Sequence, residues 1–327
     1  MIMLILSLAL ALLPAFLLIR YFVKSDKYPE PTELINKTFW LGIGTVIPVL
    51  IIVIPLSLVE DEFENAFGRA LYESFVMAAI PEEFFKFCIL YYFCSKLKEF
   101  DEPMDGIVYG ATVSLGFAAL ENVLYSTGDI TIGLLRAFTA VPSHAAWGAI
   151  MGYLFARSYF AGERPGFFHK SLLVPILLHG FYDFPLMFMD GKFFSTTGEQ
   201  GLSDEQSMIF LGCILIFVFT FVFGIRMVYK YVKEMRAEQN VGEVSSKKIS
   251  ERTSKSIEKR LGDLSNLMEK DLIDDDDYKN KMSRGTHNVR VKLEAKWDKD
   301  KGTQRRSFHV TDCKLMDLNK GYVINKD

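Results

Sequence analysis

TFWLGIGTVIPVLIIVIPLSLV, residues 38–59, contains no charged side chain. A helix needs about 20 apolar residues to cross a bilayer, so this segment indicates a membrane span. Residues 1–19 and 207–225 are uncharged as well, and four apolar segments that polar residues interrupt cover 71–95, 104–126, 130–157 and 171–190. We therefore expect an all-α polytopic membrane protein with about seven transmembrane helices.

Composition excludes several other classes of protein. A net charge of −3 over 327 residues gives no electrostatic case for nucleic-acid binding. The four cysteines lack the spacing of zinc or redox sites, so we interpret them as packing residues. The first basic residue, Arg20, follows the first apolar run, which favours a retained span over a cleaved signal peptide.

Lysine and arginine are distributed unequally between the expected loops. Alternate loops hold nine of them (Arg20, Lys24, Lys27, Lys37, Lys96, Lys98, Arg157, Arg164 and Lys170), and the intervening loops hold Arg69 and Lys192. Basic residues concentrate in cytoplasmic loops. This distribution predicts an N-terminus outside and a cytoplasmic tail from about Arg226.

The interrupted spans contain ionisable groups at bilayer depth, where an unpaired charge costs several kcal/mol and marks a functional candidate. These groups and their neighbours are Glu82, Glu83, Lys86, Glu121, Asn122, His144, His179 and Asp183. Each also has a simpler interpretation. Lys86 could neutralise one glutamate across a helical turn, His144 could be a packing residue, and His179 with Asp183 could form a local hydrogen bond.

Two observations favour a joint site over these separate roles. One lysine cannot neutralise both Glu82 and Glu83, and a surplus carboxylate in low dielectric is suited to act as a general base. Counted from the expected outer helix ends at 1.5 Å per residue, Glu82, His144 and His179 fall within roughly 5 Å of one depth. We therefore expect four helices to bring these histidines and carboxylates together.

Two imidazoles and a carboxylate are a usual ligand set for catalytic zinc, and a nearby glutamate can take the proton of a bound water. The pattern therefore favours one divalent metal, with zinc first, and a hydrolytic reaction, although the HExxH motif is absent. Small residues at Gly106, Gly110, Gly148 and Gly152 predict close contact between two of the spans.

These motifs resemble the PrsW-type intramembrane proteases, which are related to the CAAX prenyl proteases and bacteriocin-immunity membrane proteins. The matching stretches are EEFFK at 82–86, FAALE at 117–121, HAAWG at 144–148, HGFYD at 179–183 and YPEPT at 28–32. The resemblance covers about residues 1–232 and places four ordered motifs on four successive spans.

The resemblance implies cleavage of a membrane-anchored protein in the bacterial cytoplasmic membrane, with an anti-sigma factor in stress signalling as one substrate. It implies that Glu82 and Glu83, with Lys86 in the same motif, activate water. His144, His179 and Asp183 would bind the metal, or the histidines would position water and the oxyanion. Glu121 and Asn122 would be further ligands or orienting residues. A metal-free glutamate mechanism stays open.

A second class of function is a non-catalytic membrane scaffold or a proton- or cation-coupled transporter that uses the same buried carboxylates. Transporters usually contain internal repeats, and the sequence shows none. A relay of carboxylates also does not account for both histidines beside the double glutamate. We therefore expect an enzyme.

The tail after the last span changes in composition. Residues 233–256 are charged and predict a linker, and 257–284 resemble the short helical pair called SHOCT, which implies self-association or another protein contact. In 285–327, the segments 288–295 and 307–312 alternate apolar and polar residues as strands do. We expect a small cytoplasmic α+β tail.

Overall fold

The computed structural model describes residues 2–60, 62–161, 165–190, 203–269, 289–300, 303–317 and 322–323. The chain divides into two compact units, Met1–Ala237 and Glu238–Asp327, which we treat separately. The expectation of an all-α membrane domain is confirmed for the first unit.

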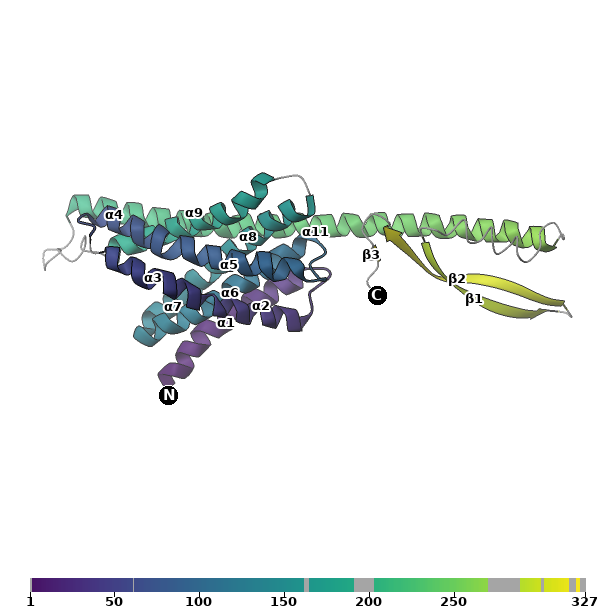
Figure 1. Cartoon of the computed structure of the whole chain (residues 1–327), viewed down its shortest axis with the longest axis horizontal. Coiled ribbons are helices and arrows are strands. Elements are labelled where there is room, and N and C mark those ends of the chain that lie inside the picture. Colours follow the sequence, from purple (N-terminus) through teal and green to yellow (C-terminus); the bar gives the residue numbers. More distant parts are fainter. Residues whose placement is uncertain are drawn as a thin grey trace. The chain divides into compact units, whose positions relative to one another are not determined.

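The first unit is a bundle of helices (Figure 1). In chain order they are α1 (Ile2–Ser25), α2 (Thr32–Gly44), α3 (Val46–Glu60), α4 (Ala66–Leu71), the π-helix η1 (Tyr72–Ala79), α5 (Ile80–Tyr92), the short 3-10 helix η2 (Cys94–Lys96), α6 (Pro103–Gly128), α7 (Ile130–Phe138), α8 (Ala140–Ala161), α9 (Pro165–Asp190) and α11 (Asp204–Glu269).

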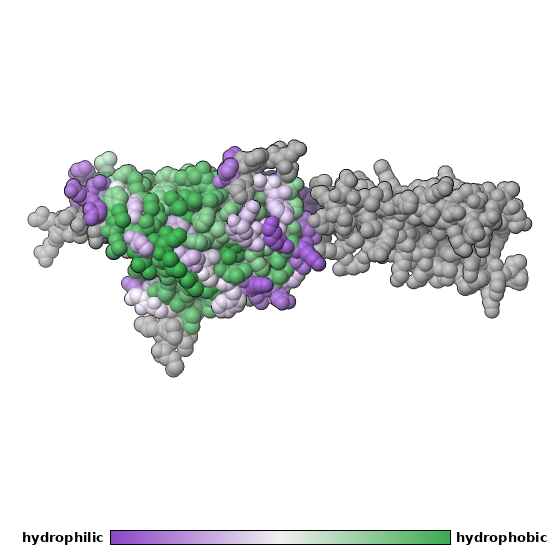
Figure 2. All heavy atoms as spheres, viewed as in Figure 1, coloured by the Kyte–Doolittle hydropathy of each residue, from purple (hydrophilic) through white to green (hydrophobic). Residues whose placement is uncertain are grey.

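Five helical stretches among the described residues are long and apolar enough to cross a membrane: Ser7–Ser25, Thr32–Glu60, Pro103–Gly128, His169–Met189 and Asp204–Asn240. The other two expected spans, 71–95 and 130–157, are built from consecutive shorter helices, namely η1 with α5 and α7 with α8. The membrane class is confirmed, and seven crossings stay a prediction. On the face in Figure 2, apolar residues cover the bundle between hydrophilic residues at its two ends.

α6 is the buried centre of this bundle because small residues let neighbouring helices approach its backbone. A Cβ atom at Gly152 would lie 1.7 Å from the Gly106 carbonyl oxygen, and one at Gly110 would lie 2.3 Å from the Gly148 carbonyl oxygen. The predicted contact between the spans at 104–126 and 130–157 is thus confirmed. It holds the N-terminal half of α6 against α8, and Glu121 and His144 lie farther along the same two helices.

The segment before the double glutamate is a π-helix, which widens the helical turn and is frequent at functional sites. It ends at Ala79, and Pro81, which has no backbone N–H, lies in the first turn of α5. Phe75 of η1 packs on Gly180 of α9, where a Cβ atom would lie 2.3 Å from the ring. Gly180 therefore allows α9 to bring His179 close to the start of α5.

α11 is fixed to α8 by contacts at its residues 228–235. The rings of Tyr153 and Tyr231 stack with centroids 3.8 Å apart. Glu234 accepts hydrogen bonds from Tyr153 Oη at 2.8 Å and from Arg157 Nη2 at 2.6 Å. Val228, Val232 and Met235 are buried in the same region.

In the second unit, α11 continues as a helix to Glu269, so residues 233–256, which composition predicted as a linker, are helical. The second half of the expected helical pair, 270–284, lies outside the described residues. β1 (Val289–Asp300), β2 (Thr303–Asp317) and β3 (Tyr322–Val323) form an antiparallel sheet in the order β1-β2-β3. The expected strands at 288–295 and 307–312 overlap β1 and β2. The domain boundaries of the tail stay a prediction.

Candidate active site

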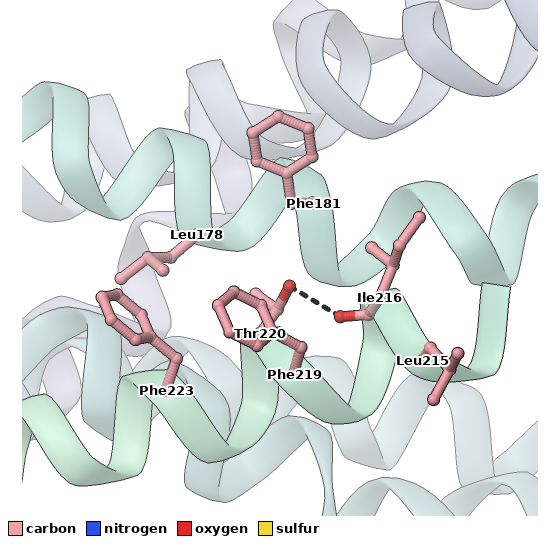
Figure 3. A pocket seen from close by; sticks show the side chains of 7 residues that line it. All are labelled: Leu178, Phe181, Leu215, Ile216, Phe219, Thr220 and Phe223. Atoms are coloured by element: carbon pink, nitrogen blue, oxygen red, sulfur yellow. Dashed lines mark hydrogen bonds between the residues drawn. The ribbon is translucent and has the colours of Figure 1, made fainter. Parts of the chain in front are cut away.

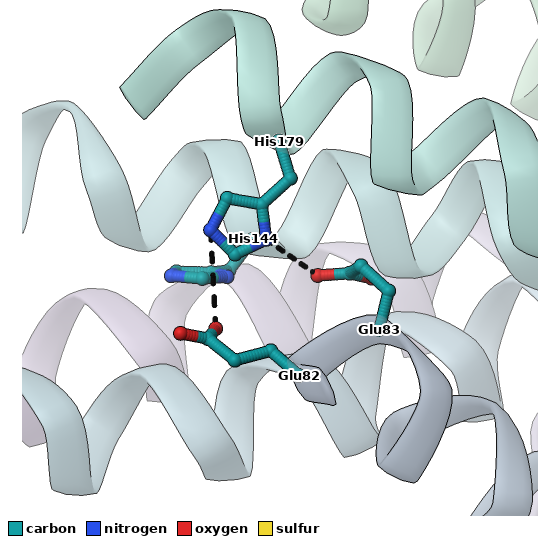
Figure 4. Close-up of side chains that lie close together, drawn as sticks. All are labelled: Glu82, Glu83, His144 and His179. Carbon is teal, nitrogen blue, oxygen red and sulfur yellow. Dashed lines mark hydrogen bonds and ion pairs between the residues drawn. The ribbon is translucent and has the colours of Figure 1, made fainter. Parts of the chain in front are cut away.

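Four side chains from three helices meet inside the bundle (Figure 4). Glu82 and Glu83 come from the first turn of α5, His144 from α8 and His179 from α9. One nitrogen or carboxylate oxygen from each lies within 4.8 Å of the others. All four are buried, so side chains that helix depth placed at one level lie together in the structure.

Lys86 lies in the same cluster and contacts three of its members. Its Nζ donates to Glu83 Oε1 at 2.8 Å and to Glu82 Oε2 at 3.2 Å, and lies 3.1 Å from His144 Nδ1. It also lies 4.1 Å from the centre of the Phe117 ring, where it can make a cation–π contact. The single ammonium thus bridges both glutamates and cannot neutralise both by itself.

The contacts of His144 determine which of its nitrogens carries a proton. An ammonium can only donate, so Nδ1 accepts from Lys86. The other nitrogen, Nε2, lies 2.9 Å from Glu121 Oε2, and an ionised carboxylate can only accept. His144 is therefore a neutral imidazole with its proton on Nε2.

His179 has the opposite arrangement, because both of its nitrogens face carboxylates. Nδ1 lies 3.0 Å from Glu83 Oε1, and Nε2 lies 3.0 Å from Asp183 Oδ2. Two carboxylate acceptors are satisfied when both nitrogens donate, which is the imidazolium form. The two histidines, which the sequence treated alike, thus differ in charge.

An aromatic wall supports the site from α8. Trp147 is fully buried and stacks on His179 with ring centroids 4.4 Å apart and an interplanar angle of 20°. Its ring also meets the edges of His144 and Tyr182. Trp147 was not expected among the site residues, since an aromatic residue in an apolar span is usually a packing residue.

The remaining expected residues divide into two groups. Glu121 contacts His144 and Asp183 contacts His179, so both lie beside the cluster. Neither belongs to the group of four side chains whose ligand atoms lie within 4.8 Å of one another. The structure does not bring Asn122 into the site. Its Nδ2 donates to the carbonyl oxygens of Leu10 and Gly133, both at 3.2 Å, so it ties α6 to α1 and α7.

The donor set fits a divalent metal in its chemistry. Two imidazoles and two carboxylates match the usual ligands of zinc, and Glu83 Oε2 is buried with no hydrogen-bond partner among the described residues. Glu83, His144 and neutral His179 would hold the ion, and Glu82 would lie beside it as a base. Asp183 and Glu121 would orient the two histidines, as outer partners of metal-bound imidazoles do.

A separate groove of about 450 Å³ runs between α9 and α11 (Figure 3). It is lined by Leu178, Phe181, Leu215, Ile216, Phe219, Thr220 and Phe223. The only polar side chain in this lining is Thr220, whose hydroxyl donates to the Ile216 carbonyl oxygen at 2.8 Å. The lining of this groove therefore contains no acidic or basic side chain, unlike the buried cluster.

Comparison with known proteins agrees with this site. Residues 30–225 match the model of the PrsW family intramembrane metalloproteases. The chain is 38% identical to Protease PrsW of Geobacillus kaustophilus over 177 residues, which are 53% of this chain and 76% of that protein. It is 40% identical to Protease PrsW of Bacillus subtilis over 177 residues, 53% of this chain and 79% of that protein.

A more distant relative, Protease PrsW of Clostridioides difficile, is 33% identical over 187 residues, 54% of this chain and 78% of that protein. No solved structure matches the chain significantly. The matched region contains every residue of the buried cluster. The chain therefore belongs to the PrsW family of intramembrane metalloproteases.

Proposed function

We propose that this chain is an endopeptidase that hydrolyses a membrane-anchored protein, with Glu82 as the carboxylate that activates water. The supporting observation is the buried cluster of two glutamates, two histidines and one lysine at membrane depth. A packing role would not explain why so many ionisable groups gather where each of them is costly to bury.

The two glutamates differ in a way that assigns the base. Glu83 is 0% exposed and its Oε1 is held by Lys86 at 2.8 Å and by His179 at 3.0 Å. Glu82 is 8% exposed and held less closely, with Lys86 at 3.2 Å and His179 Nε2 at 3.9 Å. A general base must reach a water molecule, so Glu82 suits this role and Glu83 suits the role of a fixed anchor.

In this reaction Glu82 takes a proton from water while the hydroxide oxygen bonds to the carbonyl carbon of the substrate. The negative charge that develops on the carbonyl oxygen is stabilised by the positive charge of His179. When the C–N bond breaks, the leaving amine takes the proton from Glu82. The apolar rings of Trp147 and Phe117 lie against the charged cluster. They lower the local dielectric constant, which strengthens these electrostatic interactions.

A zinc ion held by the cluster would lower the pKa of a bound water and polarise the carbonyl group. The reaction described above, with Glu82 as the base and the histidines positioning water and the oxyanion, needs no metal; the metal-assisted form, with both histidines neutral, belongs to the same reaction class. We also propose that the N-terminus lies outside and the tail in the cytoplasm, and that the substrate is a membrane-anchored protein such as an anti-sigma factor.

The experiment compares N-terminal peptides of membrane proteins from cells that express the wild type or Glu82→Gln at matched levels. Peptides that require Glu82 and begin inside or next to a membrane span would support the proposal. Glu234→Gln is the control, because Glu234 pairs with Arg157 away from the cluster. If wild type and Glu82→Gln give the same peptides under envelope stress, the non-catalytic scaffold or transporter replaces the protease.

A further inference from the structure

Arg136 is a charged residue of the bundle that none of the family motifs described above includes. It lies on α7, and its Nη2 is 2.6 Å from Glu121 Oε2. The same oxygen lies 2.9 Å from His144 Nε2. One carboxylate oxygen thus receives a guanidinium from α7 and an imidazole from α8, so Arg136 and His144 are linked through a single atom.

The helix that carries Arg136 is itself fixed to α6. Asp129 begins α7 by accepting a hydrogen bond from the Thr131 N–H at 2.7 Å. Asn122 donates to the Gly133 carbonyl oxygen at 3.2 Å, and a Cβ atom at Gly133 would lie 2.1 Å from Ser126 Cβ. α7 therefore cannot move toward α6 without a steric clash, or away from it without breaking the hydrogen bond. The backbone that carries Arg136 is thus held in place.

The guanidinium is also held in direction. Its carbon lies 4.0 Å from the centre of the Tyr125 ring on α6, a distance suited to stacking. The side chains of Arg136 and Glu121 are 17% and 18% exposed, so water screens the ion pair only in part. The Arg136 guanidinium is consequently confined between the Tyr125 ring and the Glu121 carboxylate.

We propose that Arg136 is a positioning residue that acts through Glu121 to hold the His144 ring with Nε2 toward Glu121 and Nδ1 toward Lys86. This inference rests on the proposed protease function. In the structure Arg136 contacts Glu121, and His144 contacts Lys86, which bridges the two glutamates. Loss of Arg136 would free the Glu121 carboxylate to turn, and the imidazole would lose its fixed partner.

The first test measures the rate at which Glu82-dependent N-terminal peptides appear in cells. Residues that orient a reacting histidine typically contribute 10- to 100-fold to activity, so Arg136→Gln is expected to lower the rate at least about 10-fold. Arg136→Lys keeps the charge but not the planar fork, and is expected to recover part of that loss. The double variant Arg136→Gln/Glu121→Gln is expected to match Glu121→Gln within about 2-fold, because the two residues act as one unit.

The matched control is Arg157→Gln, which also removes an arginine that lies 2.6 Å from a glutamate, here Glu234 on α11. It is expected to leave the rate unchanged. Equal losses in Arg136→Gln and Arg157→Gln would show a general structural effect and overturn the inference. A double variant that loses the product of the two single effects, or a wild-type rate in Arg136→Gln, would overturn it too.

A second measurement does not depend on activity. The chain has five histidines, so ¹⁵N labelling of histidine in the purified protein can resolve the His144 ring nitrogens. Arg136→Gln should shift the His144 signals and redistribute its proton between Nε2 and Nδ1, while Arg157→Gln should not. Unchanged His144 signals in Arg136→Gln would refute the inference. Absence of Glu82-dependent peptides from the wild type would refute the proposed function alone.

Discussion

Replacement of Gly152 by alanine tests how closely α6 and α8 must pack. A Cβ atom at this position would lie 1.7 Å from the Gly106 carbonyl oxygen, whereas ordinary van der Waals contact begins at 3.4 Å. The two backbones must therefore move apart by up to roughly 1.7 Å, which is the difference between these two distances. Excess volume in a packed core costs about 1–3 kcal/mol, and we expect the upper part of this range because the obstacle is backbone.

The separation also affects the site. His144 lies eight residues before Gly152 on α8, about 12 Å along the helix at 1.5 Å per residue. The 2.9 Å contact between His144 Nε2 and Glu121 Oε2 joins the same two helices. A shift of α8 away from α6 of about 1 Å would exceed the length range of a hydrogen bond. Gly152→Ala should therefore lose both stability and proteolysis.

The assay is thermal unfolding of the purified protein in one detergent, followed by the fraction that remains soluble. Gly212→Ala is the matched control, because a Cβ atom at Gly212 of α11 meets nothing within 4 Å among the described residues. We expect a midpoint lower by about 5 °C or more for Gly152→Ala, by the usual relation of free energy to melting temperature. Equal midpoints for the two variants would refute the close packing of α6 on α8.

Other predictions concern single residues or the metal. Asn122→Ala removes hydrogen bonds to two carbonyl oxygens and should destabilise the protein by about 1–3 kcal/mol, measured by thermal unfolding; a wild-type midpoint would contradict its assigned contacts. Lys86→Met leaves two buried carboxylates without their shared cation and should cost about 3–5 kcal/mol with loss of proteolysis, and wild-type stability would argue against the observed contacts. If the cluster holds zinc, elemental analysis should find about one ion per chain that His179→Ala loses. An active wild type without bound metal would favour the glutamate mechanism.

Much of the membrane domain could be predicted because the bilayer imposes simple constraints. An uncharged run as long as 38–59 must be buried in lipid or in protein. Hydropathy therefore predicts that the chain is a membrane protein. The rise per residue of a helix then sets depth, which places Glu82, His144 and His179 at one level from the sequence alone. The glycines at 106 and 152 similarly predicted a close helix contact.

What could not be predicted depends on the direction of side chains around each helix. Glu121 and Asn122 are neighbours in sequence, yet one contacts His144 and the other contacts α1 and α7. Rotation by about 100° per residue separates them, and the sequence alone does not say which neighbour lies on which side. Arg136 was visible as a charge in an apolar span, but its role depends on contact with a glutamate 15 residues away.

The central claim is that Glu82 activates water for peptide-bond hydrolysis within a membrane. The most direct measurement reconstitutes purified wild type, Glu82→Gln and Glu234→Gln in lipid vesicles with the single-span protein that the cellular comparison identifies. Mass spectrometry then locates the cleaved bond. We predict cleavage by wild type and Glu234→Gln at one position in or beside the membrane-spanning segment, and none by Glu82→Gln. Cleavage by folded Glu82→Gln at the wild-type rate would contradict the account.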